Sequence, residues 1–458
     1  MTTLMPQRTG ARLALLAVAQ FLVAIDFDIV FVALPAIGRD LGFTTATLQW
    51  VISAYTVVLG GFLLLGGRAA DRLGARRVFV AGLLIFGLSS LAGGLATSPG
   101  TLVAARAVQG LGAALLTPAS LKLISAGFAE GPERNRAFAV WGVAGSTGAA
   151  VGALGGGVLT HAFGWQAVLL VNVPVTIVAA AASFVVLAHD GPRIPGAFDL
   201  PGALVATLGS SLVVFGLVEA SWTLRGAGAV AAGAVLLGAF AVVERRTRDA
   251  LLPLRLLANR ALLQPTIAIF LFMAAVGTSY FLITTYLQDA LGYSSLQAGL
   301  AFLPLSLMAM LGAGRLFPQL AARHGVERTL VIGMTGLGLM LAVMATGMAV
   351  DGSYWAILPG FAWALFAGIA FPALFGAAGS AVPAAEQGVA SALVSTSQYI
   401  GGAVGMAALV AISGLDAADG TPALVDALRT AGWAAAVLML VGAAAAWAFS
   451  TRRGRQEP

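Results

Sequence analysis

The sequence predicts an all-α membrane protein with 14 transmembrane helices, arranged as two six-helix bundles with an inserted helix pair. Of the 458 residues, 59% have apolar side chains and only 10% are Asp, Glu, Lys or Arg, against about 25% charged residues in ordinary soluble domains. The apolar residues gather in runs of about 20, the length of helix that crosses a bilayer. Basic residues concentrate in alternate gaps between these runs, as expected for loops that stay in the cytoplasm.

The composition also excludes several function classes. A soluble enzyme is excluded because 25 basic and 19 acidic side chains cannot cover a soluble protein of this length. Cysteine is absent, so disulfides, thiolate metal sites and cysteine nucleophiles are excluded. The three histidines (His161, His189 and His324) fall at span ends or in loops, which excludes a histidine proton relay across the membrane. We expect no cofactor, no metal and no nucleic-acid partner.

Fourteen apolar runs are bounded by charged residues, glycine or proline, and each is read as one membrane span. The first is not read as a cleaved signal peptide, because it is long and carries Asp26 and Asp28. The predicted spans are residues 11 to 34, 46 to 67, 78 to 96, 101 to 121, 137 to 160, 166 to 188, 201 to 220, 226 to 243, 263 to 287, 296 to 317, 328 to 349, 353 to 376, 388 to 413 and 430 to 450.

The distribution of Lys and Arg predicts the orientation. With the N-terminus inside, 21 of the 25 basic residues fall in cytoplasmic segments, three fall outside (Arg39, Arg225 and Arg429), and Arg106 alone lies within a span. A miscounted helix would mix the two sets, so the split predicts an even number of spans with both termini cytoplasmic. We expect a multi-pass protein of the cytoplasmic (inner) membrane of a bacterium.

The seventh and eighth spans are short and joined by a tight turn, which predicts a helical hairpin. Six spans precede it and six follow, as in a duplicated six-helix bundle with an inserted pair. We therefore expect an N-terminal bundle over residues 1–188, cytoplasmic linkers and two additional helices over residues 189–262, and a C-terminal bundle over residues 263–458. The protein is expected to be a monomer.

Asp26, Asp28 and Arg106 lie inside predicted spans, where the cost of an ionisable group makes each a functional candidate. At 1.5 Å per residue, the two aspartates lie about 10 to 14 Å below the outer surface and the arginine about 8 Å, so an Asp–Arg pair is within reach. Asp26 and Asp28 differ by about 200° of rotation and cannot line one cavity together. We expect Asp26 to face the central cavity and Asp28 to face a neighbouring helix or polar partner. The alternative for Asp26 and Arg106 is a static contact that only fixes helix packing.

Glycines recur at intervals of three and four residues in the fifth span. This spacing places several on one face, where a second helix backbone approaches closely. Close packing and a hinge are both consistent with the pattern. The glycines are Gly142, Gly145, Gly148, Gly152, Gly155, Gly156 and Gly157.

At these positions the sequence resembles the major facilitator superfamily, and specifically its fourteen-span drug:proton antiporters. After span two, "GGRAADRLGARR" is similar to the superfamily's inner-loop signature. The resemblance implies that this loop's charges latch the two bundles on the cytoplasmic side and so control the conformational change. The matching residues are Gly67, Asp71, Arg72, Gly74 and Arg76.

Three further motifs carry the resemblance. In span four, "LVAARAVQGLGAA" is similar to a second signature with Arg106 and Gln109 at key positions, which implies that Arg106 assists proton transfer. In span five, "GAAVGALGGG", which contains Gly148 and Gly152, looks like the antiporter signature. In span one, "IDFDIVFVALP" resembles the acidic first-span motif at Asp26, with Asp28 at a place usually taken by Thr.

Four longer segments resemble the fourteen-span branch in order and spacing. They are "WQAVLLVNVP" in span six, "LLPLRLLANR" before span nine, "YLQDALGYSSLQAGL" before span ten and "GVASALVSTSQYIGGAVG" in span thirteen.

The resemblance implies a proton-coupled antiporter that exports lipophilic, cationic drugs or an endogenous metabolite by alternating access. A carboxylate whose surroundings alternate can gain and lose a proton as the conformation changes. Its partners are then protons, a small-molecule substrate and the lipid bilayer. The expected proton-coupling residues are Asp26, Arg106 and Asp28, and the expected substrate-binding residues are Asp26, Gln109, Tyr55 and Gln398.

Two alternatives remain at this stage. One is proton-coupled uptake of a small organic solute by a symporter, which the shortage of polar side chains within the spans disfavours. The other is an intramembrane enzyme or receptor scaffold. It is disfavoured because the sequence has no His or Cys cluster, no carboxylate pair on one helical face and no sizeable soluble domain.

Overall fold

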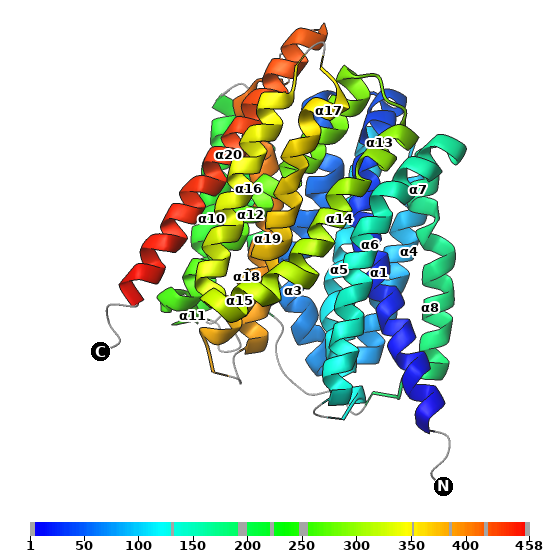
Figure 1. Ribbon diagram of the computed structural model, residues 1–458. Helices are drawn as coiled ribbons and strands as arrows, with labels where there is room; N and C mark the ends of the chain where they lie inside the picture. Colours follow the sequence, from blue (N-terminus) through cyan, green and yellow to red (C-terminus); the bar gives the residue numbers. More distant parts are fainter. Residues whose placement is uncertain are drawn as a thin grey trace.

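The computed structural model describes residues 5–129, 132–190, 199–219, 224–246, 255–349, 352–383, 387–415 and 420–453. The described residues form helices joined by short connections, without strands, which confirms the predicted all-α class. Figure 1 shows most of these helices running side by side along one direction. The first turn of α1 (Met5–Leu41) and the last turns of α20 (Gly420–Arg453) lie toward the same end of the molecule.

The first six predicted spans form one group of helices, in which α1 packs on α6 and α5 packs between α3 and α4. The described helices after α1 are α2 (Thr45–Leu48), α3 (Trp50–Leu73), α4 (Ala75–Gly94), α5 (Pro99–Gly127), α6 (Pro132–Phe163), α7 (Gln166–Leu170) and α8 (Asn172–Val186).

Local signals in the sequence set several helix boundaries. The Ser98 side chain accepts a hydrogen bond from the backbone N–H of Thr101 at the start of α5, which satisfies one of the donors left free at a helix N-terminus. Gly74 ends α3 and begins α4 with φ +105°, a backbone conformation that glycine adopts without steric cost. The loop signature therefore forms a sharp turn between two spans.

The predicted hairpin is present as α9 (Leu200–Val218) and α10 (Leu224–Arg246). The two helices pack on each other, and α9 also packs on α3 and α19 (Gln387–Ser413). Val214 and Val218 share a small apolar core with Val57 of α3 and Ala403 of α19. The inserted pair thus covers the line where the two bundles meet.

The last six predicted spans form a second group, in which α12 packs on α19 and α16 packs on both α18 and α20. Two of its spans include π-helical turns, which are rare and often lie at functional sites. Its remaining elements are α11 (Arg255–Ala258), α12 (Arg260–Thr285), η1 (Tyr286–Ala290), α13 (Ser295–Ala301), α14 (Leu303–Leu311), η2 (Gly312–Leu316), α15 (Phe317–His324), α16 (Val326–Gly347), α17 (Tyr354–Ile357), η3 (Leu358–Ala362) and α18 (Trp363–Ser380).

Thirteen described helical segments are long and apolar enough to cross a membrane. The predicted span from 137 to 160 falls on α6, of which Val151–Phe163 counts only as a shorter apolar helix. The multi-pass architecture is therefore confirmed, and the count of fourteen stays a prediction.

The apolar core is divided in an asymmetric way. We call the end of the molecule opposite the first turn of α1 the distal end. Near it, Ile29 and Phe31 of α1 and Trp165 belong to the same core cluster as Phe281 and Phe302 of the second bundle. Toward the opposite, proximal end, the first bundle has a core of its own, which includes Leu16, Leu63 and Phe79. The bundles therefore share a core at the distal end and have separate cores at the proximal end.

Candidate functional site

Asp26 and Arg106 form an ion pair inside the first bundle. The Arg106 Nη1 atom donates to Asp26 Oδ2 at 2.6 Å, and neither residue is measurably exposed. Arg106 also donates from Nε to the Val51 carbonyl oxygen of α3 at 3.0 Å, so one side chain of α5 ties together three helices. The contact inferred from the depth of the two residues in their spans is confirmed.

Three uncharged polar residues complete what we call the Asp26 network, which consists of Asp26, Ser90, Arg106, Gln109 and Asn172. The amide nitrogens of Gln109 and Asn172 donate to Asp26 Oδ1 at 2.7 and 2.6 Å. The Gln109 nitrogen also contacts Ser90 Oγ at 2.7 Å, and its carbonyl oxygen accepts from Arg106 at 2.7 Å. The Asp26 carboxylate thus has one charged and two neutral donors, drawn from α5 and α8.

Tyr55 of α3 adds an aromatic face to this network. The guanidinium carbon of Arg106 lies 4.4 Å from the centre of the Tyr55 ring, a distance suited to a cation–π interaction. The Tyr55 hydroxyl group and the Nη2 atom of Arg106 are buried, and neither has a hydrogen-bond partner among the described residues. Both groups are therefore free to form new hydrogen bonds when the packing of the helices changes.

The structure corrects the expected direction of Asp26. Its side chain points into the first bundle, with no measurable exposure, and it does not line the pocket between the bundles. The same holds for Tyr55 and Gln109, which were expected to bind substrate. The physical reason is the cluster of donors: a carboxylate with three partners inside the bundle is better stabilised there than at an apolar wall.

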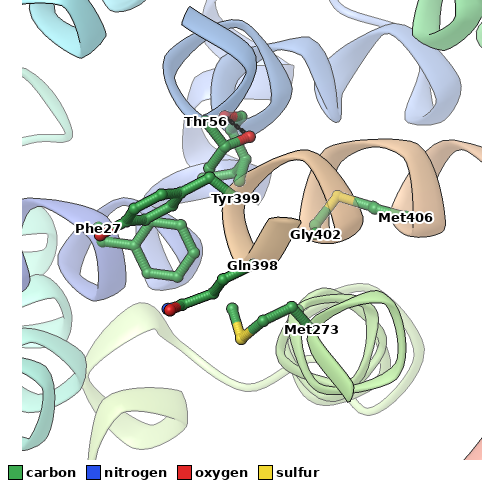
Figure 2. A pocket seen from close by; sticks show the side chains of 9 residues that line it. Phe27, Thr56, Met273, Gln398, Tyr399, Gly402 and Met406 are labelled. Carbon is green, nitrogen blue, oxygen red and sulfur yellow. Dashed lines mark hydrogen bonds between the residues drawn. The ribbon is translucent and has the colours of Figure 1, made fainter. Parts of the chain in front are cut away.

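Gln398 is the expected substrate contact that lines the pocket between the two bundles. Figure 2 shows Gln398 and Tyr399 of α19, Phe27 of α1 and Met273 of α12 turned toward the same small space. Its volume is about 10 Å³, roughly the least that holds one water molecule. The complete lining is Phe27, Ile52, Thr56, Met273, Gly277, Gln398, Tyr399, Gly402 and Met406.

Asp28 lies on a different side of α1 from Asp26, as the helical rotation predicted. A Cβ atom added to Gly152 of α6 would lie 3.0 Å from the Asp28 Cβ, so this carboxylate group leaves the helix beside α6. Tyr280 of α12 lies within electrostatic reach of it. Asp28 is 7% exposed and faces the boundary between the bundles.

The glycine face of α6 lies against α1. Cβ atoms added to Gly148, Gly152 and Gly156 would lie 2.5 to 3.0 Å from atoms of Phe21, Ile25, Asp28 or Ile29. These distances are shorter than ordinary van der Waals contact, so only glycine permits this approach of the two backbones. The close packing expected from the pattern is present, while the hinge role stays a prediction.

The loop after α3 is held within its own bundle. Asp71 Oδ1 accepts from Lys122 Nζ of α5 at 2.7 Å. The Asp190 carboxylate accepts from the backbone N–H groups of Arg76 and Arg77 at 3.0 and 2.9 Å, at the N-terminus of α4, where a negative charge is favourable.

The other loop residues complete this picture. Arg76 donates to the Phe184 carbonyl oxygen of α8 at 3.0 Å, which again joins two helices of one bundle. Gly67 lies on α3, where an added Cβ atom would lie 3.8 Å from the Cβ atom of Pro118 of α5. Arg72 lies in the last turn of α3. The latch between bundles that the resemblance implies for Asp71 and Arg72 stays a prediction, since Lys122, which donates to Asp71, belongs to the first bundle.

The two bundles are joined at the distal end by specific contacts. Arg39 of α1 forms an exposed ion pair with Asp289 of η1 at 3.3 Å. The Gln288 amide nitrogen donates to the Val32 carbonyl oxygen at 2.8 Å, and a Cβ atom on Gly157 of α6 would lie 2.6 Å from the Ser295 carbonyl oxygen of α13. At the proximal end, α15 packs on α16 and α18 of its own bundle and has no buried residue.

A metal site is not found in the part of the chain that the structure describes, because no group of three or more His, Asp or Glu residues lies close enough to hold an ion. The chemistry of the site is therefore that of one ion pair, its amide and hydroxyl partners, and an apolar pocket beside them.

The family model of the major facilitator superfamily matches residues 16–406. The chain belongs to the major facilitator superfamily. Members of this superfamily are membrane transporters and not enzymes, so the multi-pass fold and the site belong to a protein that moves a solute across a membrane. The resemblance seen in the sequence motifs is confirmed.

Curated relatives in the superfamily are antibiotic exporters and resistance proteins. The chain is 39% identical to the cephamycin export protein of Amycolatopsis lactamdurans, over 90% of this chain and 86% of that protein. It is 38% identical to the puromycin resistance protein of Streptomyces alboniger, over 89% and 82%. It is 33% identical to the tetracenomycin C resistance and export protein of Streptomyces glaucescens, over 88% and 75%.

Solved structures of other transporters share the fold. A crystal structure of the peptide transporter POT has a TM-score of 0.72, with 17% identity over 97% of this chain and 95% of that chain. The POT family transporter PepTSo has a TM-score of 0.69, with 15% identity over 99% of each chain. At these identities the likeness concerns the arrangement of helices alone.

Sequence reasoning missed Ser90 and Asn172, because attention to ionisable residues passes over uncharged ones. Asn172 opens the strongly apolar helix α8, where an amide group has few partners except side chains of other helices. That isolation was the available signal. Ser90 carries no such signal, since serine commonly hydrogen-bonds to its own helix.

Proposed function

We propose that this superfamily member is a proton-coupled antiporter that exports lipophilic, cationic drugs or an endogenous metabolite by alternating access. It acts as a monomer with fourteen spans in the cytoplasmic membrane of a bacterium, with both termini inside. Residues 1–188 and 263–458 are the two moving bundles, and residues 189–262 carry the linkers and the additional pair. The similarity to export and resistance proteins for cephamycin, puromycin and tetracenomycin C supports drugs as the substrate class.

The observation that carries the proposal is the buried Asp26–Arg106 ion pair. An ion pair in the apolar interior is stable only while both charges and their hydrogen bonds are present. When Asp26 takes up a proton, Arg106 loses its counter-charge and must find other partners, and this changes the packing of α1 against α5. Protonation of Asp26 and the packing of α1 against α5 are therefore thermodynamically coupled, as proton-coupled transport requires.

The apolar pocket is the second support. In this conformation its volume of about 10 Å³ is far too small for a drug, since sites for such ligands measure about 300 to 1,000 Å³. Separation of the bundles would enlarge it. Met273 and Met406 on its second-bundle side have flexible, polarisable side chains, which adapt to ligands of different shape.

The distribution of contacts supports alternating access in a defined direction. With the termini in the cytoplasm, the distal end faces outside, and its shared core and its ion pair between Arg39 and Asp289 close the outer side. The separate proximal cores leave the cytoplasmic side free to open. The described conformation is thus the one from which the transporter would open toward the cytoplasm.

The test is proton-driven transport in inverted vesicles. Dyes, quaternary ammonium compounds and antibiotics are first screened for resistance in an efflux-deficient host, and the best substrate is then used. Asp26→Asn should lower uptake driven by the pH gradient by about tenfold or more. Asp426→Asn, the same chemical change at a residue that is 77% exposed, is the matched control and should transport normally.

Two results would overturn the proposal. One is full gradient-driven transport by correctly folded Asp26→Asn protein, because the buried carboxylate would then be dispensable. The other is accumulation of the substrate in intact cells instead of its extrusion, which would favour the proton-coupled uptake of a small organic solute.

A further inference from the structure

Asp28 is a buried acid without a counter-charge. Within the described ranges, no side chain or backbone group donates a hydrogen bond to its carboxylate, and no basic residue forms an ion pair with it, although the residue is only 7% exposed. Asp26, two residues earlier, is fully matched by Arg106 and two amide groups. The two neighbouring acids of α1 therefore lie in opposite electrostatic situations.

Aromatic rings cover the boundary between the bundles beside Asp28. The ring of Tyr280, which is within electrostatic reach of Asp28, stacks on Phe302 at 5.7 Å between centroids. It also lies 5.7 Å from Phe31 of α1 and 5.6 Å from Trp363 of α18. Tyr280 is half-buried, whereas Phe31, Phe302 and Trp363 are fully buried. The half-buried ring of Tyr280 therefore lies near the carboxyl group of Asp28, which has no counter-charge among the described residues.

This region adjoins the pocket between the bundles through Phe27. Phe27 lines that pocket, and its ring makes an edge-to-face contact with Phe31 at 5.5 Å. Phe31 follows Asp28 by three positions and Phe27 by four, so its side chain neighbours each of them on the surface of α1. A ligand in the enlarged pocket would therefore meet the rings first and the carboxylate next to them.

We propose that Asp28, with the rings of Tyr280 and Phe31, is the recognition site for the positively charged group of an organic cation carried by this transporter. The inference rests on the proposed function and assigns one site to the charged group of its substrates. An ammonium or phosphonium group supplies the charge that Asp28 lacks, and the faces of aromatic rings attract the same charge.

The balance of charge favours a substrate cation over a second internal ion pair. Asp26 and Arg106 neutralise each other, whereas the described residues offer no counter-charge to the buried carboxyl group of Asp28, so its ionised form is favoured only when a cation lies beside it. A buried charge without a partner is costly. Because the two acids point to different sides of α1, proton exchange at Asp26 and cation binding at Asp28 can be separated by mutation.

The experiment measures binding of radiolabelled tetraphenylphosphonium to the purified full chain in nanodiscs by equilibrium dialysis. Asp28→Asn removes the charge with little change in shape, and should weaken binding by about 30-fold or more, as for truncation of a desolvated charge pair. Asp28→Glu keeps the charge and should keep most of the binding. Asp426→Asn is the control for loss of one carboxylate and should bind like wild type.

A second pair of variants tests the aromatic wall and holds even if Asp28→Asn fails to fold. Tyr280→Leu should weaken binding by about fivefold through loss of the cation–π contact, whereas Tyr280→Phe keeps the ring face and should bind normally. Elution volume and thermal midpoint of each variant establish that it is folded.

The outcomes separate this inference from the proposed function. Binding needs no proton gradient, so Asp28-dependent binding without gradient-driven efflux would defeat the proposed function and leave the cation site standing. Wild-type affinity in folded Asp28→Asn protein, or no retention of tetraphenylphosphonium by the wild-type chain, overturns the cation site. Undiminished export of this cation by Asp28→Asn would do the same while the antiporter proposal stands.

Discussion

The Asp26 network of the first bundle and helix α12 of the second bundle bury polar groups in different ways. In the first bundle, side chains of four helices (α1, α4, α5 and α8) meet in the Asp26 network and hydrogen-bond to one another. In the second bundle, buried hydroxyl groups of α12 donate to the carbonyl oxygen four residues earlier in the same helix. These residues are Thr266, Thr278 and Ser279. The buried carboxylate of the first bundle is therefore matched by side chains of other helices, whereas these hydroxyl groups of α12 are matched within their own helix.

This difference has a mechanical consequence. Hydrogen bonds between helices hold them at a fixed distance and respond when one partner changes its charge. Hydrogen bonds within a helix leave its outer surface apolar, so neighbouring helices touch through side chains that can slide. Under the proposed function, the Asp26 network would respond to a proton, and α12 would present an adaptable apolar wall to the substrate.

The largest effect is expected from removing Arg106, the cation of the Asp26 network. Arg106→Met leaves Asp26 as a buried charge without its ionic partner, so we expect the free energy of unfolding to fall by about 3 to 5 kcal/mol. Gradient-driven transport should be lost. Denaturant titration in mild detergent measures the first effect, and uptake by inverted vesicles measures the second.

The companion variant is Arg106→Lys. It keeps the charge but loses the simultaneous contacts with Asp26, Val51 and Gln109, because an ammonium group lacks the planar fork of a guanidinium group. It should recover part of the stability and little of the transport. If Arg106→Met protein is as stable as wild type and still transports, the Asp26–Arg106 ion pair is required neither for stability nor for transport.

Much of the fold can be predicted from the sequence because the signals for it are read along the chain and need no knowledge of which helices are neighbours. Run length and loop charge locate the spans, and two short runs around a tight turn locate the hairpin. The glycine periodicity of α6 locates a close contact, but it cannot name α1 as the partner, since any neighbouring helix would satisfy the same pattern.

The site was predictable only in part. Depth along two spans brought Asp26 and Arg106 together, because both distances are counted from the same membrane surface. The direction of Asp26 was predicted wrongly, since it depends on donors from α5 and α8 that no local pattern links to α1. Gln398 lines the pocket, and its expected contact with substrate stays a prediction, whereas Tyr55 lies under Arg106.

An intermediate effect is expected from Asn172→Leu, which tests the neutral part of the network. The substitution keeps the size of the side chain but removes a donor to Asp26 Oδ1 at 2.6 Å and leaves Ser90 with one contact fewer. Leaving a buried acceptor short of a donor costs about 1 to 3 kcal/mol. The free energy of unfolding measures it, and the same value as wild type would mean that Gln109 and Arg106 suffice for the carboxylate.

The smallest effect is expected from Thr278→Val, which is the matched change in the second bundle. Thr278 is as deeply buried as Asn172, and its Oγ1 atom donates to the Ala274 carbonyl oxygen at 2.7 Å. That oxygen keeps its helical hydrogen bond when the hydroxyl group is lost, and valine has the same shape as threonine. The loss of stability should therefore stay below about 1 kcal/mol, with transport unchanged. Should Thr278→Val cost as much as Asn172→Leu, polarity within a helix would matter as much as polarity between helices, and the two bundles would not differ in the way their contacts indicate.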